Sequence, residues 1–217
     1  SGPKDNAETL SWQEFRDKSV QAANMFRRLG IGETDVVAYL LPICNEAALT
    51  LIGGSISGIA NPINPLLEPD QIAAILRETN AKVLVTLRGF PKTNLAQLAA
   101  DAVAQAPNVE TVLEVDLNRY LTPPKSWIVP LVRPKVVATH SAKIMDFNAE
   151  LDRQNRVIDF ADTAEDRVAA YFHTGGTTGM PRVAQHEYSG IVYNGWLGDR
   201  MLFASEETII CPLPLFH

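Results

Sequence analysis

Residues 167–182 read Arg167-Val-Ala-Ala-Tyr-Phe-His-Thr-Gly-Gly-Thr-Thr-Gly-Met-Pro-Arg182. The first part, residues 168–173, is a short apolar run rich in aromatic and β-branched residues, and a Gly-rich segment ends it after six residues. Such a run is typical of a buried strand rather than a helix. His173 is the last residue of this predicted strand, and its position fits equally a role in bracing the next segment or in contacting a substrate.

The segment after the predicted strand consists of six small residues. Glycines permit positive φ and let backbone N–H groups turn toward one point, while threonine hydroxyls add further donors. A concave array of donors suits an anionic phosphate. Arg182, four residues after the last threonine of the segment, adds positive charge. We therefore expect phosphate groups to be bound by Thr174, Gly175, Gly176, Thr177, Thr178, Gly179 and Arg182.

A ligand-free turn is the alternative explanation for this segment, because a strand, a Gly-rich turn and a helix occur in many α/β proteins without a ligand. However, β-branched threonine is a poor residue where positive φ is needed, so phosphate binding is favoured. The segment is not a Walker loop, since no Gly is followed by Lys and then Ser or Thr. A helix is expected at 186–201, with its N-terminal dipole pointing toward the same phosphates. Its aromatic residues Tyr193 and Trp196 are expected in the core, and lining a pocket is the alternative.

The chain before residue 116 alternates between predicted strands and helices. A continuous apolar run predicts a buried strand at 36–41, and further strands are predicted at 59–62, 82–87 and 109–115. Periodic apolar stripes and end signals predict helices at 12–29, after the capping box Ser11-Trp-Gln-Glu14, and at 45–58, 69–80 and 93–105. This alternation predicts an α/β fold with a mainly parallel sheet and helices on both faces. Four prolines between residues 123 and 134 interrupt the pattern, so 116–166 is expected to be an irregular excursion with a single helix at about 146–154.

Composition narrows the class of protein. A chain of 217 residues with 46% hydrophobic and 20% charged residues is typical of a soluble globular protein with a substantial core. The net charge of −6 without a basic cluster disfavours nucleic acid as a partner. The uncharged stretch 47–67 is broken by Asn and Pro, so no transmembrane segment is expected.

The two cysteines and the N-terminal residues bear on the cellular compartment of the protein. Cys44 and Cys211 lie far apart without metal or redox spacing, which suits a reducing compartment and predicts a cytoplasmic protein. The sequence leaves a disulfide between them open. No His, Cys or carboxylate residues have ligand spacing, so no metal is expected to be bound by this chain. No signal peptide opens the chain, and the lack of an initiating Met predicts that residues precede Ser1.

The segment Thr174-Gly-Gly-Thr-Thr-Gly-Met-Pro-Arg182 closely resembles the nucleotide loop of the adenylate-forming superfamily, which comprises acyl- and aryl-CoA synthetases, peptide-synthetase adenylation domains and luciferases. The loop of that family usually reads Thr-Ser-Gly-Thr-Thr-Gly-x-Pro-Lys-Gly. This chain has Gly175 for Ser, Arg182 for Lys and Val183 for Gly. Arginine keeps the charge of the lysine but presents a planar fork rather than a point charge, which puts the family's lysine contact in question.

A second resemblance lies at the last residues, where Pro212-Leu-Pro-Leu-Phe-His217 is similar to the Pro-x-Phe-His segment of acyl-CoA synthetases. In that family the histidine lies beside the acyl carboxylate, so the resemblance implies a place for His217 in the catalytic site. Amino-acid-activating relatives carry an Asp close to this motif, and residues 212–217 contain none. A plain carboxylic acid is therefore the expected substrate.

The resemblance, weakest over 116–166, implies that residues 1–217 are the N-terminal portion of the AMP-binding domain of an AMP-forming acyl-CoA synthetase. Such an enzyme uses ATP with Mg²⁺ to convert a carboxylic acid, here expected to be a fatty acid, to an acyl-adenylate, from which CoA displaces AMP. Its adenine, ribose, metal and catalytic lysine contacts are expected beyond His217. The chain alone is thus expected to be inactive and to self-associate through exposed apolar surface. A non-catalytic nucleotide-binding or scaffold module and an amino-acid adenylation domain are the alternatives.

Overall fold

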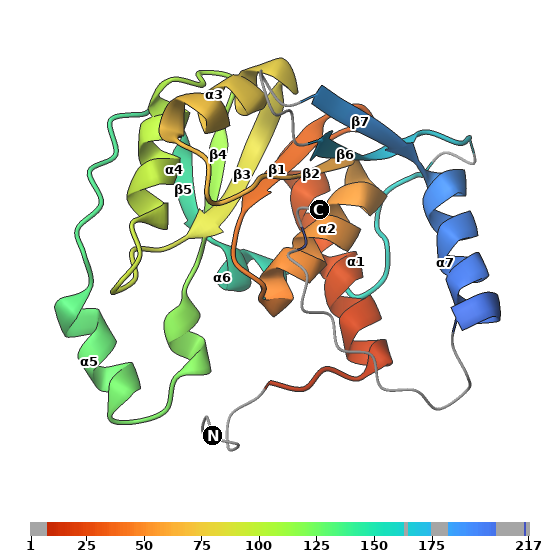
Figure 1. The fold of residues 1–217 in the computed structure, drawn as a ribbon. Helices are drawn as coiled ribbons and strands as arrows, with labels where there is room; N and C mark the ends of the chain where they lie inside the picture. Colours follow the sequence, from red (N-terminus) through yellow and green to blue (C-terminus); the bar gives the residue numbers. More distant parts are fainter. Residues whose placement is uncertain (1–7, 163–164, 175–181, 203–214, 216–217) are drawn as a thin grey trace.

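The computed structural model describes residues 8–162, 165–174, 182–202 and 215 (Figure 1). The strands of this part are β1 (Val36–Leu40), β2 (Ile59–Pro62), β3 (Ala81–Leu87), β4 (Thr111–Val115), β5 (Lys143–Asp146), β6 (Val168–Thr174) and β7 (Arg182–Glu187). The helices are α1 (Trp12–Arg28), α2 (Asn45–Ser57), α3 (Pro69–Glu78), α4 (Leu95–Ala104), α5 (Lys125–Val132), α6 (Phe147–Asp152) and α7 (Tyr188–Leu202), with a 3-10 helix η1 (Leu117–Tyr120).

The described strands form one sheet in the order β5-β4-β3-β1-β2-β6-β7. Strands β1 to β6 pair in parallel, and β7 pairs antiparallel with β6. The chain therefore moves from β1 to β2, returns to the other side of β1 for β3, β4 and β5, and then joins β6 to β2. The predicted α/β fold with a mainly parallel sheet is confirmed.

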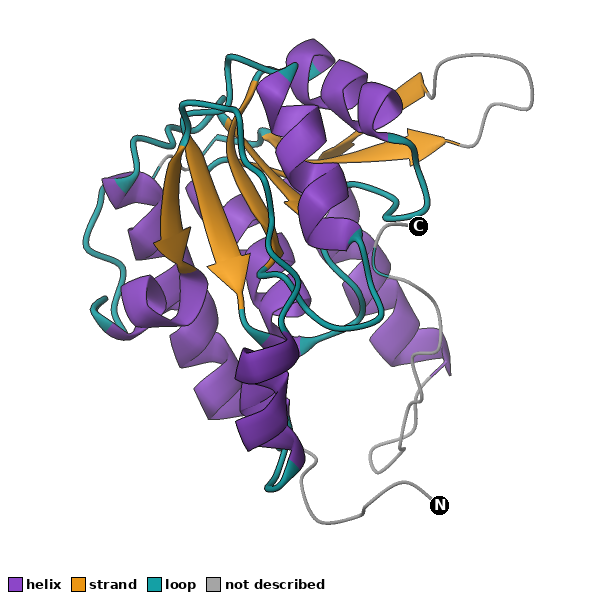
Figure 2. Ribbon diagram, turned by 90° about the vertical axis from the view of Figure 1, so that its left-hand side faces the viewer, coloured by secondary structure: helices purple, strands orange, loops and turns teal. Residues whose placement is uncertain are grey.

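Helices cover both faces of this sheet, as Figure 2 shows. Helix α1 packs against α2 and α6 on one face, whereas α3 and α4 pack against each other on the opposite face. Parallel crossovers are right-handed, so the reversal of direction after β2 places α3 and α4 across the sheet from α2. Gly53 lets α1 and α2 approach closely, because a Cβ atom at this position would lie 2.5 Å from the Cβ of Ala22.

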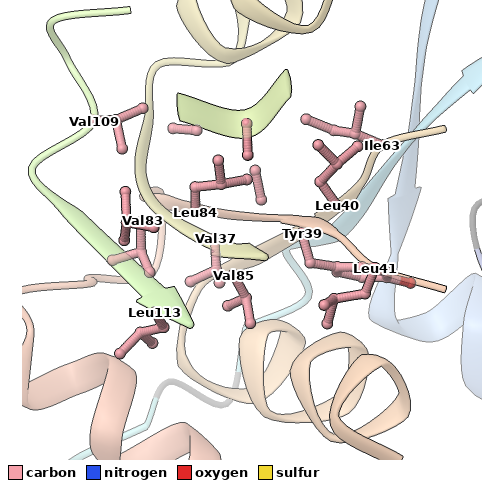
Figure 3. Close-up of a cluster of buried hydrophobic side chains, with 14 of the residues drawn as sticks. Val37, Tyr39, Leu40, Leu41, Ile63, Val83, Leu84, Val85, Val109 and Leu113 are labelled. Atoms are coloured by element: carbon pink, nitrogen blue, oxygen red, sulfur yellow. The ribbon is translucent and has the colours of Figure 1, made fainter. Parts of the chain in front are cut away.

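The core lies along the central strands β1 and β3. All five residues of β1 are buried, and Figure 3 shows Tyr39 of β1 on the same side of the strands as Val37 and Val85, and Leu84 on the other side. Strands covered on both faces need apolar side chains in both directions, which is why continuous apolar runs rather than alternating ones marked them in the sequence. The predicted strands β1 to β4 and helices α1 to α4 are confirmed, including the capping box between Ser11 and Glu14.

The helix predicted at 186–201 is confirmed as α7, whereas the expectation that its N-terminal dipole points toward the phosphates is wrong. Strand β7 comes first, and α7 begins at Tyr188 rather than at residue 186. A six-residue strand spans about 20 Å, so the N-terminus of α7 lies at the far end of β7 from Arg182 and its dipole does not act on the segment. The physical reason is that β6 offers a free edge, which β7 pairs with.

Two further expectations need correction. Besides the predicted helix, found as α6, the range 116–166 holds η1, α5 and the edge strand β5, which pairs with β4. In α7, the side chains of Tyr193 and Trp196 are 59% and 53% exposed, so they do not lie in the core. Helix α7 contacts β7 and stands at the side of the molecule (Figure 1). None of the described helices combines the length and hydrophobicity needed to cross a membrane.

Candidate functional site

Two of the predicted phosphate-binding residues, Thr174 and Arg182, belong to the described residues. Gly175, Gly176, Thr177, Thr178, Gly179 and the predicted catalytic residue His217 lie outside them. Thr174 ends β6 and Arg182 begins β7, and the two residues face each other across the antiparallel pair. The Cα atoms of Thr174 and Arg182, which flank segment 175–181 in the sequence, therefore lie within about 5.5 Å of each other.

This hairpin opens at the carboxyl edge of the parallel strands. Strand β6 is parallel to β2, with Ala170 opposite Ala60, so Thr174 lies at the same edge as the carboxyl ends of β1, β2 and β3. Ligands of open α/β sheets bind outside the carboxyl ends of the strands. Thr174 and Arg182, which flank the Gly- and Thr-rich segment in the sequence, therefore lie at the edge where a ligand of this fold class is expected.

His173 is braced from inside the sheet. Its Nε2 atom lies 2.8 Å from Oδ1 of Asn61, a fully buried residue of the neighbouring strand β2. Burial lowers the pKa of the His173 imidazole, which favours the neutral ring. Of the two roles that the sequence left open, the contact in the structure is the bracing one. The sequence had no signal for Asn61.

The last residues of the chain are described at one position, Leu215. The Tyr39 hydroxyl of β1 donates a hydrogen bond to the Leu215 carbonyl oxygen at 2.8 Å. Tyr39 is buried near the carboxyl end of β1, and burial raises the pKa of its phenol. The backbone two residues before His217 is therefore attached to the same edge of the sheet as the hairpin.

A buried carboxylate lies in the first turn of α2, the helix that follows the carboxyl end of β1. Glu46, in the first turn of α2, has no exposed side-chain surface. It accepts hydrogen bonds from Arg119 and from the Tyr120 hydroxyl (2.7 Å), both in or next to η1, and from Asn148 Nδ2 (3.2 Å). The cluster joins the start of α2 to the excursion after β4, and sequence reasoning did not find it.

Arg167 fixes the opposite end of the hairpin. Its guanidinium donates to the carbonyl oxygens of Gly58 (2.7 Å) and Ile56 (2.9 Å) at the C-terminus of α2. The Tyr188 hydroxyl donates to Ser55 in the same turn, and the Arg167 guanidinium lies over the Tyr188 ring. These contacts satisfy helix-terminal carbonyls that have no partner within the helix.

We expect Arg167→Met to lower the free energy of unfolding by about 2 kcal/mol, because charge-assisted hydrogen bonds to the end of α2 are lost. Urea denaturation followed by circular dichroism measures this change. Arg16→Met is the matched control, since Arg16 is 73% exposed and its ion pair with Asp17 is long, at 4.0 Å. Equal midpoints for the Arg167 and Arg16 variants would contradict the assignment.

The chain is similar to known proteins over most of its length. Residues 3–217 match the family model described as AMP-binding enzyme. The chain is 33% identical to the marinolic acid–CoA ligase of Pseudoalteromonas sp. (strain SANK 73390), over 98% of this chain and 30% of that protein. It is 26% identical to 4-coumarate–CoA ligase 1 of Arabidopsis thaliana, over 100% of this chain and 36% of that protein.

The chain thus spans about a third of the length of these curated relatives. Its fold is similar to the crystal structure of the anthranilate CoA ligase AuaEII in complex with anthranoyl-AMP. The TM-score is 0.63 at 18% identity, and the match covers 84% of this chain and 32% of that chain.

Proposed function

The chain belongs to the AMP-binding enzyme family, and we propose that the full-length protein is an AMP-forming CoA ligase. The observation that carries this proposal is the match of residues 3–217 to the family, together with relatives whose names are those of CoA ligases. The hairpin supports it, because β6 and β7 bring Thr174 and Arg182 together at the carboxyl edge of the sheet.

The proposed reaction has two steps. A carboxylate oxygen attacks the α-phosphorus of ATP, the bond from that phosphorus to the bridging oxygen breaks, and pyrophosphate leaves. The CoA thiol then attacks the acyl carbon, its proton is lost, and AMP leaves. Both steps depend on positioning and on neutralising developing charge rather than on a protein nucleophile.

The proposed roles of this chain follow from its donors. The backbone amides and hydroxyls of Thr174, Gly175, Gly176, Thr177, Thr178 and Gly179 hold the β- and γ-phosphates, and Arg182 adds positive charge at the mouth of the hairpin. His217 lies beside the substrate carboxylate in this proposal.

Backbone amides, hydroxyls and an arginine are the chemical groups that phosphate oxygens need, so the residues fit ATP. The described residues hold no group of three or more side chains able to ligate a metal ion. Mg²⁺ commonly keeps few protein ligands and binds through substrate phosphates. When bound, it would neutralise part of the phosphate charge, and this chain would act on it through the phosphates.

The substrate we propose is a plain carboxylic acid, with a fatty acid as the first class to test. An aromatic acid is the second class, because relatives are named for 4-coumarate and a structural neighbour for anthranilate. A cytoplasmic location stays a prediction from the two cysteines.

Carboxylate-dependent pyrophosphate release by the full-length protein tests the proposal. Fatty acids of several lengths, 4-coumarate and a mixture of amino acids are compared, each with and without CoA. Release that needs a plain acid, followed by CoA-dependent release of AMP, is the expected result. Dependence on amino acids would identify an adenylation domain instead, and no acid-dependent release would favour a non-catalytic module.

Residues 1–217 alone are expected to release no pyrophosphate above background, because the chain spans about a third of its relatives. We also expect this fragment to self-associate, since Val192, Tyr193 and Trp196 of α7 are more than half exposed. Size-exclusion chromatography at several concentrations measures the second effect. Acid-dependent turnover of ATP by the fragment would show that its catalytic parts lie within residues 1–217.

A further inference from the structure

A chain of side-chain hydrogen bonds runs from α3 through β2 to the end of β6. Thr79, which caps α3, donates from Oγ1 to the Ile75 carbonyl oxygen at 2.8 Å. Asn61 Nδ2 lies 3.2 Å from that Oγ1 atom, and Asn61 Oδ1 lies 2.8 Å from Nε2 of His173. Asn61 and Thr79 are buried, at 0% and 8% exposure.

Asn61 is an unusual residue for its place. Asparagine is depleted in strands, and a buried amide is costly unless its donors and acceptor are paired. Here the amide faces Thr79 on one side and His173 on the other. The Asn61 side chain thus connects β2 to α3 on one side and to the neighbouring strand β6 on the other.

The direction of these hydrogen bonds follows from the Thr79 end. Because the Thr79 hydroxyl proton is given to Ile75, the Thr79 oxygen must accept from Asn61 Nδ2. Asn61 Oδ1 then remains as an acceptor, so His173 must carry a proton on Nε2. The imidazole proton is thereby assigned by the surrounding protein.

The reverse direction is unfavourable. It would turn the Asn61 amide around and place the imidazole proton on Nδ1 of His173. That Nδ1 atom is buried and has no hydrogen-bond partner among the described residues. An orphaned buried N–H group is rarer and costlier than an unused acceptor, so Nδ1 carries a lone pair.

The charge of the ring is settled by its surroundings. Burial lowers the pKa of His173, and Glu78 of α3 acts in the opposite direction to a smaller extent. His173 donates to an amide oxygen and not to a carboxylate. The ring is therefore neutral near pH 7.

We propose that Asn61 is a positioning residue for the phosphate-binding segment, which it serves by holding His173 as the neutral Nε2–H tautomer directly before Thr174. This inference rests on the proposed function. An imidazole in this state presents an acceptor and no positive charge, so it braces the stem of the hairpin and does not itself bind phosphate. In the described part of the hairpin, the cation expected to contact phosphate is then Arg182, which lies opposite Thr174.

Two variants of the full-length protein test the inference. Asn61→Leu removes both hydrogen bonds of the side chain. We expect the KM for ATP to rise about tenfold while kcat changes by less than about threefold. A tenfold change corresponds to the net contribution of about one hydrogen bond. Thr86→Val is the matched control, because Thr86 is another buried strand residue with one side-chain bond, to the Leu40 carbonyl oxygen. It should leave the KM for ATP unchanged. An equal rise in both variants would overturn the inference in favour of general packing.

The tautomer is measured directly by ¹⁵N NMR of the full-length protein labelled on its histidine side chains, with the His173 signals assigned from their loss in His173→Gln. At pH 7 we expect a protonated Nε2 and an unprotonated Nδ1. A protonated Nδ1 in the unaltered protein would overturn the inference.

The two proposals fail in different ways. A protein with no ATP-dependent reaction would overturn the proposed function and the positioning role together. A protein that does use ATP but shows the other tautomer, or an unchanged KM in Asn61→Leu, would overturn only the role of Asn61. The NMR measurement needs no ATP, so it separates these cases.

Discussion

Replacing Thr177 and Thr178 together by valine in the full-length protein is expected to lower kcat/KM for ATP by about a hundredfold or more. Valine keeps the shape of threonine but lacks the hydroxyl, so the change removes two donors from the proposed phosphate site. Removal of a single preorganised donor aimed at developing charge costs about 10²–10³-fold in known enzymes. Initial rates of pyrophosphate release at varied ATP concentration measure the effect.

Thr111→Val is the matched control for this pair. Thr111 is a buried threonine at the start of β4, and three strands (β3, β1 and β2) lie between β4 and β6 in the sheet. The control should retain the ATP dependence of the unaltered protein. If the double variant keeps both its affinity for ATP and its rate, the segment does not hold phosphate and the proposed function loses its main support.

Arg119→Met is expected to lower the free energy of unfolding at pH 7 by about 3–5 kcal/mol. The Glu46 carboxylate is fully buried and is paired with Arg119, so the variant leaves a buried charge without its cation. The Tyr120 hydroxyl and Asn148 remain as donors and do not replace that charge. Denaturant unfolding followed by tryptophan fluorescence gives the change.

The pH dependence of this effect has a definite sign. Burial raises the pKa of Glu46, but the hydrogen bonds from Tyr120 and Arg119 outweigh it and hold the pKa below its ordinary value of 4.5. The contribution of Glu46 is therefore present above pH 4.5 and is lost as the pH falls through the lower, folded-state pKa. Without Arg119, burial prevails and the carboxyl binds a proton more readily. The destabilisation by Arg119→Met should then shrink as the pH falls from 7 toward 4.

Arg153→Met provides the control for Arg119. Arg153 pairs with Glu150 at the surface, where its side chain is 67% exposed, and such pairs contribute little. Its loss should change the unfolding midpoint much less than the loss of Arg119 does. A destabilisation by Arg119→Met that is the same at pH 7 and pH 4 would contradict a buried, charged Glu46.

Elements whose signals are local could be predicted from the sequence. The apolar runs of β1 and β3 predicted buried strands because strands covered on both faces need apolar side chains throughout. The capping box at Ser11 predicted the start of α1, because its hydrogen bonds join residues only three positions apart in the sequence. The Gly- and Thr-rich segment identified the family because its chemistry is carried by consecutive residues.

Elements and contacts that need a partner far away in the sequence could be found in the folded chain alone. Strands β5 and β7 are short and partly polar, and they form because β4 and β6 offer free edges for their backbone hydrogen bonds. The pairs Glu46–Arg119 and Asn61–His173 join residues 73 and 112 positions apart. No local pattern marks such residues, because their polar side chains are buried only where the folded chain brings a matching donor or charge to them.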